Sequence, residues 1–248
     1  MTERIWGFRA PEVKTVSVRI PGWEGPARVV QLTDLHFGLV TPKRLLDLAV
    51  DRANALEPDL VVLTGDFVCR GYRFIGQITN TLARLEAPAV AVLGNHDHWV
   101  AADAVRRALE RANVEVLQNR WTRVDVRGAP LAVAGMDDST TRNHDPDATV
   151  AGLPDHPVLG LTHNPAAAPL LWERGVRGVL SGHTHAGQFH VKGVTSGLYA
   201  KVLGQPFLGG MYEEPGGWVY VSAGLGAGAV PWRTGEPARR EVTLLELG

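Results

Sequence analysis

The chain has 248 residues, of which 45% are hydrophobic, and this supplies enough apolar material for a well-buried domain. The count of 25 Lys and Arg against 26 Asp and Glu gives a formal net charge of -1, so no global field draws the chain toward nucleic acid, and we expect no nucleic-acid partner. A single cysteine, Cys69, excludes a disulfide framework within the chain.

Residues 1–20 contain no apolar core behind a basic start, so they do not resemble a signal peptide. No stretch of the sequence approaches the roughly 18 uninterrupted apolar residues of a membrane-spanning helix. We therefore expect a cytoplasmic protein without a transmembrane segment, and we leave peripheral contact with a membrane open.

The first half of the chain alternates short apolar runs with helical patterns. Runs that are apolar on both faces are typical of parallel strands covered by helices, so the fold class predicted here is α/β. The expected strands are Val13–Ile20, Val29–Thr33, Leu60–Leu63 and Ala89–Leu93. The expected helices are Pro42–Leu56, Phe74–Leu85 and Ala101–Arg111.

The second half is predicted to consist mainly of strands, with one short helix near Ala166–Glu173. Asp137–Pro154 is expected to be a surface loop, and the Gly-rich segment Val191–Gly217 a lid or a specificity loop. No long linker divides the chain, so we expect a single domain over residues 1–248. The expected strands are Val114–Leu117, Leu131–Ala134, Val158–Thr162, Gly178–Leu180, Trp218–Ser222 and Val242–Leu247.

Polar motifs directly follow five of the predicted apolar runs. Ligand-binding groups in open α/β sheets gather beyond the carboxyl ends of strands. Taken alone, a Gly-Asp after a strand is more often a helix cap, and a histidine pair at a turn is often structural. Five such motifs in one chain are not explained in that way, and together they predict a metal site. The motifs are Asp34-Leu35-His36, Gly65-Asp66, Gly94-Asn95-His96-Asp97, Thr162-His163-Asn164 and Gly182-His183-Thr184-His185.

The donor types indicate which ions the site holds. Carboxylate, imidazole and amide oxygen suit Mn²⁺, Fe or Zn²⁺. A single zinc ion needs only about four ligands, so a larger set indicates two divalent metal ions that share a carboxylate. Two ions about 3.5–4 Å apart clamp the attacking and leaving oxygens of a phosphoryl group. We expect Mn²⁺ first, with Fe or Zn²⁺ as alternatives. The candidate ligands are Asp34, His36, Asp66, Asn95, His163, His183 and His185.

This ordered series of motifs resembles that of the calcineurin-like metallophosphoesterase superfamily. The runs Ser181–Gln188, which contains GHTHAGQ, and Tyr220–Arg233 further resemble a bacterial subgroup whose members often carry a twin-arginine signal or an amino-terminal anchor. Neither feature is recognisable in this sequence. The resemblance implies a four-layer αββα fold, in which a two-sheet β-sandwich is flanked by helices. It also implies that a hydroxide bridging two metals attacks a phosphomonoester or a phosphodiester in a small phosphorylated substrate.

The resemblance further implies how the ligands divide between the ions. The first metal would be held by Asp34, His36 and His185. The second would be held by Asn95, His163 and His183. Asp66 would bridge them.

A catalytic pair beside the metals is also implied by the resemblance. His96 would lie outside the metal shell, where it stabilises the phosphate or protonates the leaving oxygen, and Asp97 would orient its imidazole. General acid chemistry agrees with this role, because an imidazole titrates near neutral pH and a carboxylate partner fixes its tautomer.

Two other functions stay open at this point. One is hydrolysis of a nucleotide-linked lipid such as UDP-2,3-diacylglucosamine, for which the apolar residues in Leu198–Met211 would form a wall; core packing under a loop is the alternative interpretation of that stretch. The other is a non-catalytic scaffold, but relatives of that kind usually lose ligands, and this chain keeps them.

Several residues outside the metal set have two interpretations. Arg233 could pair with a phosphate or form a surface ion pair. His98 and Trp99 could line the pocket or start a helix, and Cys69 is expected to be an ordinary residue near the site. Remaining histidines are expected at the surface or around the site: His144, His156 and His190. Single tryptophans are expected in the core or half-buried: Trp6, Trp23, Trp121, Trp172 and Trp218.

Overall fold

The computed structural model describes residues 4–5, 8–155, 157–191, 194–228 and 230–248. The predictions for Trp6 and His156 therefore concern residues outside the described ranges.

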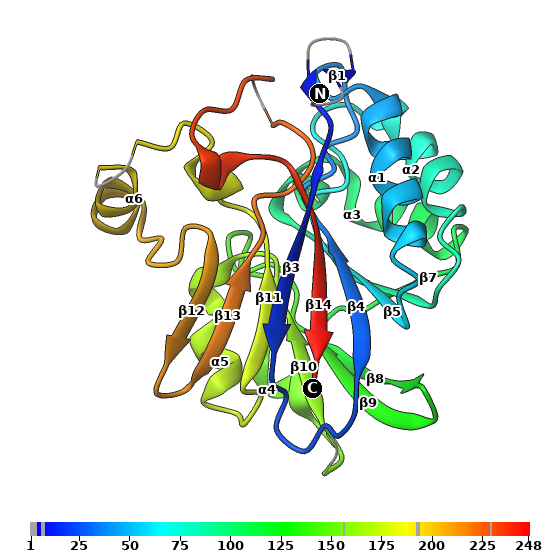
Figure 1. Cartoon of the computed structure of the whole chain (residues 1–248), viewed down its shortest axis with the longest axis vertical. Coiled ribbons are helices and arrows are strands. Elements are labelled where there is room, and N and C mark those ends of the chain that lie inside the picture. Colours follow the sequence, from blue (N-terminus) through cyan, green and yellow to red (C-terminus); the bar gives the residue numbers. More distant parts are fainter. Residues whose placement is uncertain (1–3, 6–7, 156, 192–193, 229) are drawn as a thin grey trace.

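One sheet of six strands has the spatial order β3-β14-β4-β5-β6-β7 (Figure 1). Strands β4 to β7 pair in parallel, as their apolar sequences predict, whereas β14 returns antiparallel to β4. The strands are β3 (Glu12–Val18), β4 (Ala27–Leu32), β5 (Leu60–Thr64), β6 (Ala89–Val92), β7 (Val114–Val116) and β14 (Glu241–Leu247).

The second sheet also has six strands, in the order β12-β13-β11-β10-β9-β8. Its four central strands are parallel, and the edge strands β8 and β12 pair antiparallel with their neighbours. The strands are β8 (Arg120–Val126), β9 (Ala129–Gly135), β10 (Val158–Leu161), β11 (Gly178–Ser181), β12 (Gly210–Glu214) and β13 (Gly217–Val221). A separate small hairpin joins β1 (Arg4–Ile5) and β2 (Phe8–Arg9).

Helices cover the outer faces of the two sheets (Figure 1). The first sheet is covered by α1 (Lys43–Ala55), α2 (Ile75–Leu82) and α3 (Asn95–Glu110). Beside the second sheet lie α4 (Pro146–Val150) and α5 (Ala168–Trp172). Helix α6 (Thr195–Leu203) stands away from both sheets. Short 3-10 turns are η1 (Tyr72–Phe74), η2 (Pro165–Ala167), η3 (His185–Gly187) and η4 (Glu236–Ala238).

Successive side chains along the buried strands point to opposite faces of the sheet, so each sheet packs on both sides. In β5, Val61 and Leu63 pack with the covering helices, whereas Leu60 and Val62 pack in the core between the sheets. On the far side of the second sheet, Val179 of β11 packs with residues of α5. The order is therefore helix, sheet, sheet, helix, which confirms the predicted fold class.

A buried side chain ties the two sheets together at one end. Gln31, near the end of β4, donates from Nε2 to Oγ1 of Thr64 (2.9 Å) and to the carbonyl oxygen of Ser181 in the other sheet (2.9 Å). Because a buried amide is costly to leave without partners, these bonds favour one placement of the sheets. The carboxyl ends of the parallel strands from both sheets consequently meet at this end.

Most predicted elements are present, but several boundaries were wrong. Helix α3 begins at Asn95, inside the Gly-Asn-His-Asp motif, and the predicted start at Ala101 coincides with a kink where φ is -178° and ψ is 79°. The segment Asp137–Pro154, predicted to be a loop, contains α4, which begins behind the side-chain cap Asp145. The edge strand β8 was not predicted, because its residues are mostly polar and half-exposed.

The segment Val191–Gly217 is also more regular than predicted, since it contains α6 and β12. Its apolar residues do not form a single cluster: Phe207 and Leu208 are buried, whereas Leu198, Val202 and Leu203 are exposed. The interpretation as core packing therefore holds for the end of the stretch and fails for the helix.

Within the described residues, no helix has both the length and the apolar character needed to cross a bilayer. The cytoplasmic location stays a prediction.

The core between the sheets generates a stability prediction. Leu60 is fully buried there, so we expect Leu60→Ala to lower the free energy of unfolding by about 2–5 kcal/mol through lost burial and a residual cavity. Urea denaturation measures it. The control Leu39→Ala removes the same atoms from an exposed side chain and should change stability by about 0.5 kcal/mol or less. Equal losses in the two variants would contradict this packing.

Candidate metal centre

The seven predicted metal ligands come together where the carboxyl ends of the strands meet. One sheet contributes the loops after β4 and β5 and the first turn of α3, and the other contributes the loops after β10 and β11. All but one of these side chains belong to buried residues, and His183 is partly buried. The residues in chain order are Asp34, His36, Asp66, Asn95, His163, His183 and His185.

A first group of donor atoms surrounds the Nε2 atom of His185. Nε2 of His36 lies 3.1 Å from it, and Oδ1 of Asp34 lies 3.4 Å from it. The same Asp34 oxygen is 3.8 Å from Nε2 of His36. The ligand atoms of these three residues lie within 4.8 Å of one another, a spacing that could hold a metal ion.

A second group surrounds the Nε2 atom of His163. Oδ1 of Asn95 and Nδ1 of His183 each lie 3.2 Å from it. Oδ2 of Asp66 is 3.4 Å from this nitrogen and 3.5 Å from Nε2 of His36 in the first group. Asp66 therefore lies between the two groups and is close to a histidine of each.

Burial keeps most of these imidazoles neutral at physiological pH. It lowers the pKa of His36 to about 3 and that of His183 to about 4. Burial and the nearby Arg233 cation place the pKa of His185 well below its usual value. Neutral imidazoles are the form that ligates metals.

Among the described residues, no lysine or arginine lies at ion-pair distance from the carboxylates of Asp34 and Asp66. Burial raises the pKa of Asp34 to about 6. Burial also opposes charge on Asp66 and His163, but their mutual attraction prevails: it lowers the pKa of Asp66 and raises that of His163 to about 10. Buried carboxylates among imidazoles, of which all but His163 are neutral, are a donor set that suits a divalent cation.

Neighbouring groups hold the ligands in orientation. His163 donates from Nδ1 to the carbonyl oxygen of Thr64 (2.7 Å), which directs its Nε2 toward Asp66 and Asn95. The hydroxyl of Thr33 donates to Oδ2 of Asp34 (2.9 Å), and the backbone N–H of His183 donates to the same oxygen (3.1 Å). The carbonyl of Thr64 was not a sequence candidate, because a main-chain acceptor leaves no signal in residue type.

Arg233 plays a part that the sequence did not predict. Its Nη2 donates to Nδ1 of His185 (2.8 Å), and its guanidinium also donates to carbonyl oxygens, including those of Ala223, Gly224 and Gly226. Of the two predicted roles, the surface ion pair was wrong, because these acceptors hold the guanidinium, and pairing with a phosphate stays a prediction. Since arginine only donates, the proton of neutral His185 lies on Nε2, facing His36, and an ion held there would replace it.

The backbone at the ligands is locally strained. Positive φ values are uncommon for residues other than glycine and concentrate at functional sites. Here they occur at five of the predicted ligands, with φ between 48° and 72°. This is the pattern expected where side chains from short loops must all point at one centre. The residues are Asp34, His36, Asp66, His183 and His185.

Glycines allow the ligand loops to approach closely. A Cβ added at Gly94 would lie 2.5 Å from the backbone nitrogen of Asp66 and closer still to its carboxylate. Gly65 has φ +93°, and a Cβ there would lie 2.7 Å from Nδ1 of His163. The Gly-Asp and Gly-Asn motifs thus both require glycine for space, and Gly65 requires it for conformation as well.

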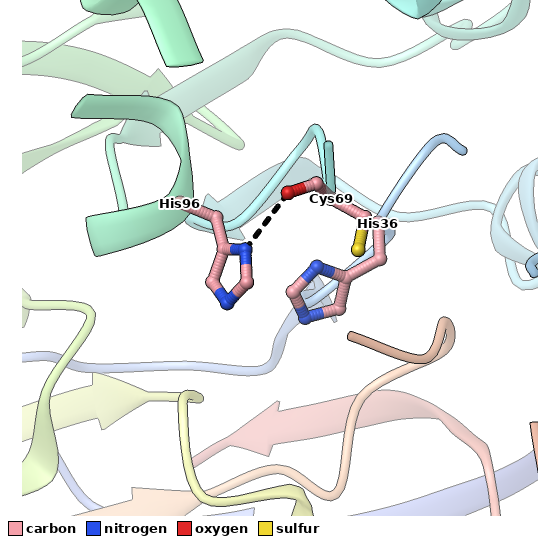
Figure 2. Close-up of side chains that lie close together, drawn as sticks. All are labelled: His36, Cys69 and His96. Carbon is pink, nitrogen blue, oxygen red and sulfur yellow. Dashed lines mark hydrogen bonds between the residues drawn. The ribbon is translucent and has the colours of Figure 1, made fainter. Parts of the chain in front are cut away.

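His96 lies beside the predicted ligand His36, but Asp97 does not orient it. The Nδ1 atom of His96 donates to the carbonyl oxygen of Cys69 (2.9 Å; Figure 2), and its ring lies 4.8 Å from that of His36. Asp97 instead accepts from the backbone N–H groups of Phe67, Val68 and Gly94. The expected contact was wrong because helix α3 starts at Asn95 and its first turn directs Asp97 back toward these N–H groups.

Cys69 lies close to His36 and His96, and the three could together hold a metal ion (Figure 2). Burial raises the pKa of its thiol, and its Sγ donates to the carbonyl oxygen of Gly228 (2.6 Å). A protonated thiol with a partner is a poor metal ligand. Cys69 thus lies next to the predicted ligands, as expected.

The two residues after Asp97 have different roles. His98 contacts Oδ1 of Asp137 through Nε2 (2.7 Å) and lies beside Asn143, so its role is structural. Trp99 is exposed, and its ring lies 5.0 Å from that of His96. His144 and His190 take no part in the ligand groups, and Nδ1 of His190 lies 3.2 Å from the carbonyl oxygen of Ala186.

The fold and the predicted ligands match those of a known protein family. A sequence profile described as calcineurin-like phosphoesterase matches residues 27–187, which includes every predicted ligand. The chain belongs to the calcineurin-like phosphoesterase family. Membership implies a domain that hydrolyses phosphoric esters with divalent metal ions, for which the buried His and Asp groups are suitable ligands.

Relatives within this family cover nearly the whole chain. It is 32% identical over 260 residues to a bovine protein (Bos taurus) called transmembrane protein with metallophosphoesterase domain, covering 96% of this chain and 57% of that protein. It is 28% identical over 230 residues to phosphodiesterase YaeI of Escherichia coli, covering 90% of this chain and 82% of that protein. The chain thus spans little more than half of the bovine relative.

A solved structure supports the fold alone. The crystal structure of TT1561 of Thermus thermophilus aligns with a TM-score of 0.52 at 14% identity, covering 82% of this chain and 92% of that one.

The close approach of Gly94 to Asp66 generates a prediction about metal content. In Gly94→Ala the added methyl would displace the Asp66 carboxylate, so we expect metal bound per chain to fall by at least about half. Plasma mass spectrometry of the purified variant measures it. Gly76→Ala, where nothing lies within 4 Å of the new Cβ, is the matched control and should keep its metal. Full metal content in Gly94→Ala would contradict the assigned position of Asp66.

Proposed function

We propose that the chain, acting as a single domain over residues 1–248, holds two divalent metal ions and hydrolyses a phosphodiester or a phosphomonoester. The observation that carries this proposal is the position of Asp66, whose Oδ2 lies 3.5 Å from His36 and 3.4 Å from His163. One carboxylate oxygen beside two donor groups is suited to a shared ligand.

The ligands would divide between the ions along these two groups. Asp34, His36 and His185 would hold one ion. Asn95, His163 and His183 would hold the other. Asp66 would be common to both. When bound, such ions lower the pKa of a water molecule to supply the nucleophile and neutralise charge on the phosphoryl oxygens.

His96 is the residue proposed to handle the proton. Its Nδ1 donates to the Cys69 carbonyl, so Nε2 is left to carry or release a proton toward a bound phosphoester. A group at this position can protonate the leaving oxygen as the ester bond breaks. Asp97 supports this indirectly, because its three bonds to backbone N–H groups fix the turn that carries His96.

For the ions we propose Mn²⁺, with Fe or Zn²⁺ as alternatives, because the donors are imidazole and oxygen. A small phosphorylated substrate, in the first instance a phosphodiester, fits a relative that bears the name phosphodiesterase and the absence of a large basic excess in the chain. No nucleic-acid partner is expected.

Turnover of bis-p-nitrophenyl phosphate and p-nitrophenyl phosphate tests this function. We expect hydrolysis in Mn²⁺ that is lost with a chelator and restored by added metal, since the site depends on the ions. No hydrolysis of any phosphoester with any divalent metal, in protein shown to be folded, would contradict the proposal. An empty site in protein purified without chelator would favour a scaffold.

Two variants separate the proposed roles. His96→Ala should lower kcat by about 10²–10⁴-fold while metal content stays near that of the wild type, because a proton donor is lost and no ligand is. Asp66→Ala should lower the occupancy of both ions, because the shared ligand is lost. Steady-state kinetics and metal analysis on the same samples measure both effects. Equal metal loss in the two variants would refute the separation.

A further inference from the structure

The exposed apolar side chains of this protein are not spread evenly over its surface. Among the described residues, large apolar side chains with high exposure range from Val13 at 44% to Leu39 at 81%. All but Val13 lie in segments that follow the carboxyl ends of parallel strands, at the same end as the metal centre. They are Leu39, Tyr72, Trp99, Phe189, Val191, Val194, Leu198, Val202, Leu203 and Trp232.

These segments are residues 33–42, 65–74, 93–99, 182–209 and 222–240, and their described residues form what we call the loop face. The first four of these segments each contain a predicted ligand. The fifth, residues 222–240, contacts one, because Arg233, next to Trp232, donates to His185. The apolar side chains therefore surround the reaction centre. Single exposed apolar residues are ordinary, but a concentration at one functional end marks an interaction surface.

Helix α6 makes the largest contribution to this surface. Val194, Leu198 and Val202 follow one another at four-residue spacing and are all exposed, so they lie along one side of the helix. The buried Thr195 connects the start of the helix to the preceding loop, because its Oγ1 donates to the carbonyl oxygen of Phe189 (3.2 Å). Figure 1 shows α6 projecting from the sheets, and it packs beside η3, which contains His185.

The loop face is also basic, although the whole chain is nearly neutral. Its acidic residues Asp34, Asp66 and Asp97 are buried, which leaves Glu236 as the one exposed acidic residue in these segments. Exposed basic side chains lie among the apolar ones, and they are Arg70, Arg73, Lys201 and Arg239. Apolar side chains with interspersed cations are the combination that binds anionic lipid surfaces.

A cavity of about 650 Å³ beside Trp232 concentrates this positive charge. Arg9, Arg233, Arg239 and Arg240 contribute to its lining, and they outnumber the two acidic residues there, Glu236 and Glu12, of which Glu12 pairs with Arg239 (3.2 Å). Arg240 is only 8% exposed and forms no ion pair with any described residue. Its Nη2 donates to the carbonyl oxygen of Pro231 (2.7 Å) and its guanidinium lies over the ring of Phe8, but its Nε has no hydrogen-bond partner. A buried cation without a counter-charge is costly, so the cavity suits an anionic head group.

We propose that the loop face docks on the surface of an anionic lipid bilayer and thereby brings the metal centre to phosphoesters at that surface. The delivery of phosphoesters to the centre rests on the proposed function, whereas binding of the loop face to the bilayer does not. A bilayer fits better than a protein partner, because a protein seated on these loops would cover the entrance to the centre, whereas a bilayer presents phosphoesters to it.

Vesicle flotation with the full chain tests this proposal. We expect the protein to float with phosphatidylcholine vesicles that contain about one third phosphatidylglycerol and to bind pure phosphatidylcholine vesicles about tenfold more weakly. Leu198→Ser combined with Val202→Ser should weaken binding to the anionic vesicles by about tenfold or more. The matched control Val13→Ser, outside the loop face, should bind like the wild type.

A pair of charge variants tests the electrostatic part. Arg70→Glu should weaken binding to the anionic vesicles, whereas Arg123→Glu, on the remote strand β8, should not. Turnover of bis-p-nitrophenyl phosphate in solution should be unchanged in the Leu198 and Val202 variant, so a failure of docking is distinguished from a failure of the enzyme. The proposal would be overturned if the protein stayed in solution with both vesicle types. It would also be overturned if the Leu198→Ser, Val202→Ser variant bound anionic vesicles as strongly as the wild type.

Discussion

The position of Asp66 is the constraint on which the rest of the structure depends. Its carboxylate is buried at the line where the two sheets meet, 3.5 Å from a histidine of one sheet and 3.4 Å from a histidine of the other. A buried carboxylate is costly unless it is paired, so the surrounding donors must be placed accurately. The close approach of Gly94, the bond of Gln31 between the sheets, and the carbonyl of Thr64 that orients His163 all serve this placement.

The layered fold explains how so many donors reach one centre. Parallel strands bring the loop after each strand to the same end, and two sheets packed face to face double the number of loops available. The short loops cannot direct every side chain inward in relaxed conformations, and ligands such as Asp34 and His183 accordingly have positive φ. The buried core between the sheets stabilises the fold that holds this local strain.

Sequence reasoning predicted the apolar strands, their covering helices and the set of donors, because periodicity and strand-end motifs are local signals. It failed where the cause lies in three dimensions. The start of α3 and the partners of Asp97 depend on a turn in which Asp97 accepts from the backbone N–H of Phe67. The role of Arg233 depends on carbonyl oxygens that leave no trace in residue type. The exposure of Leu198 was likewise not decided by the sequence, since an apolar stretch in a Gly-rich segment is compatible both with core packing and with an exposed wall.

Anomalous diffraction from crystals grown with Mn²⁺ tests the central claim most directly. Two peaks about 3.5–4 Å apart are expected, one beside His36 and His185 and the other beside His163 and Asn95, with an oxygen of Asp66 within about 2.3 Å of both. A single peak, or two peaks that do not share Asp66, would contradict the account.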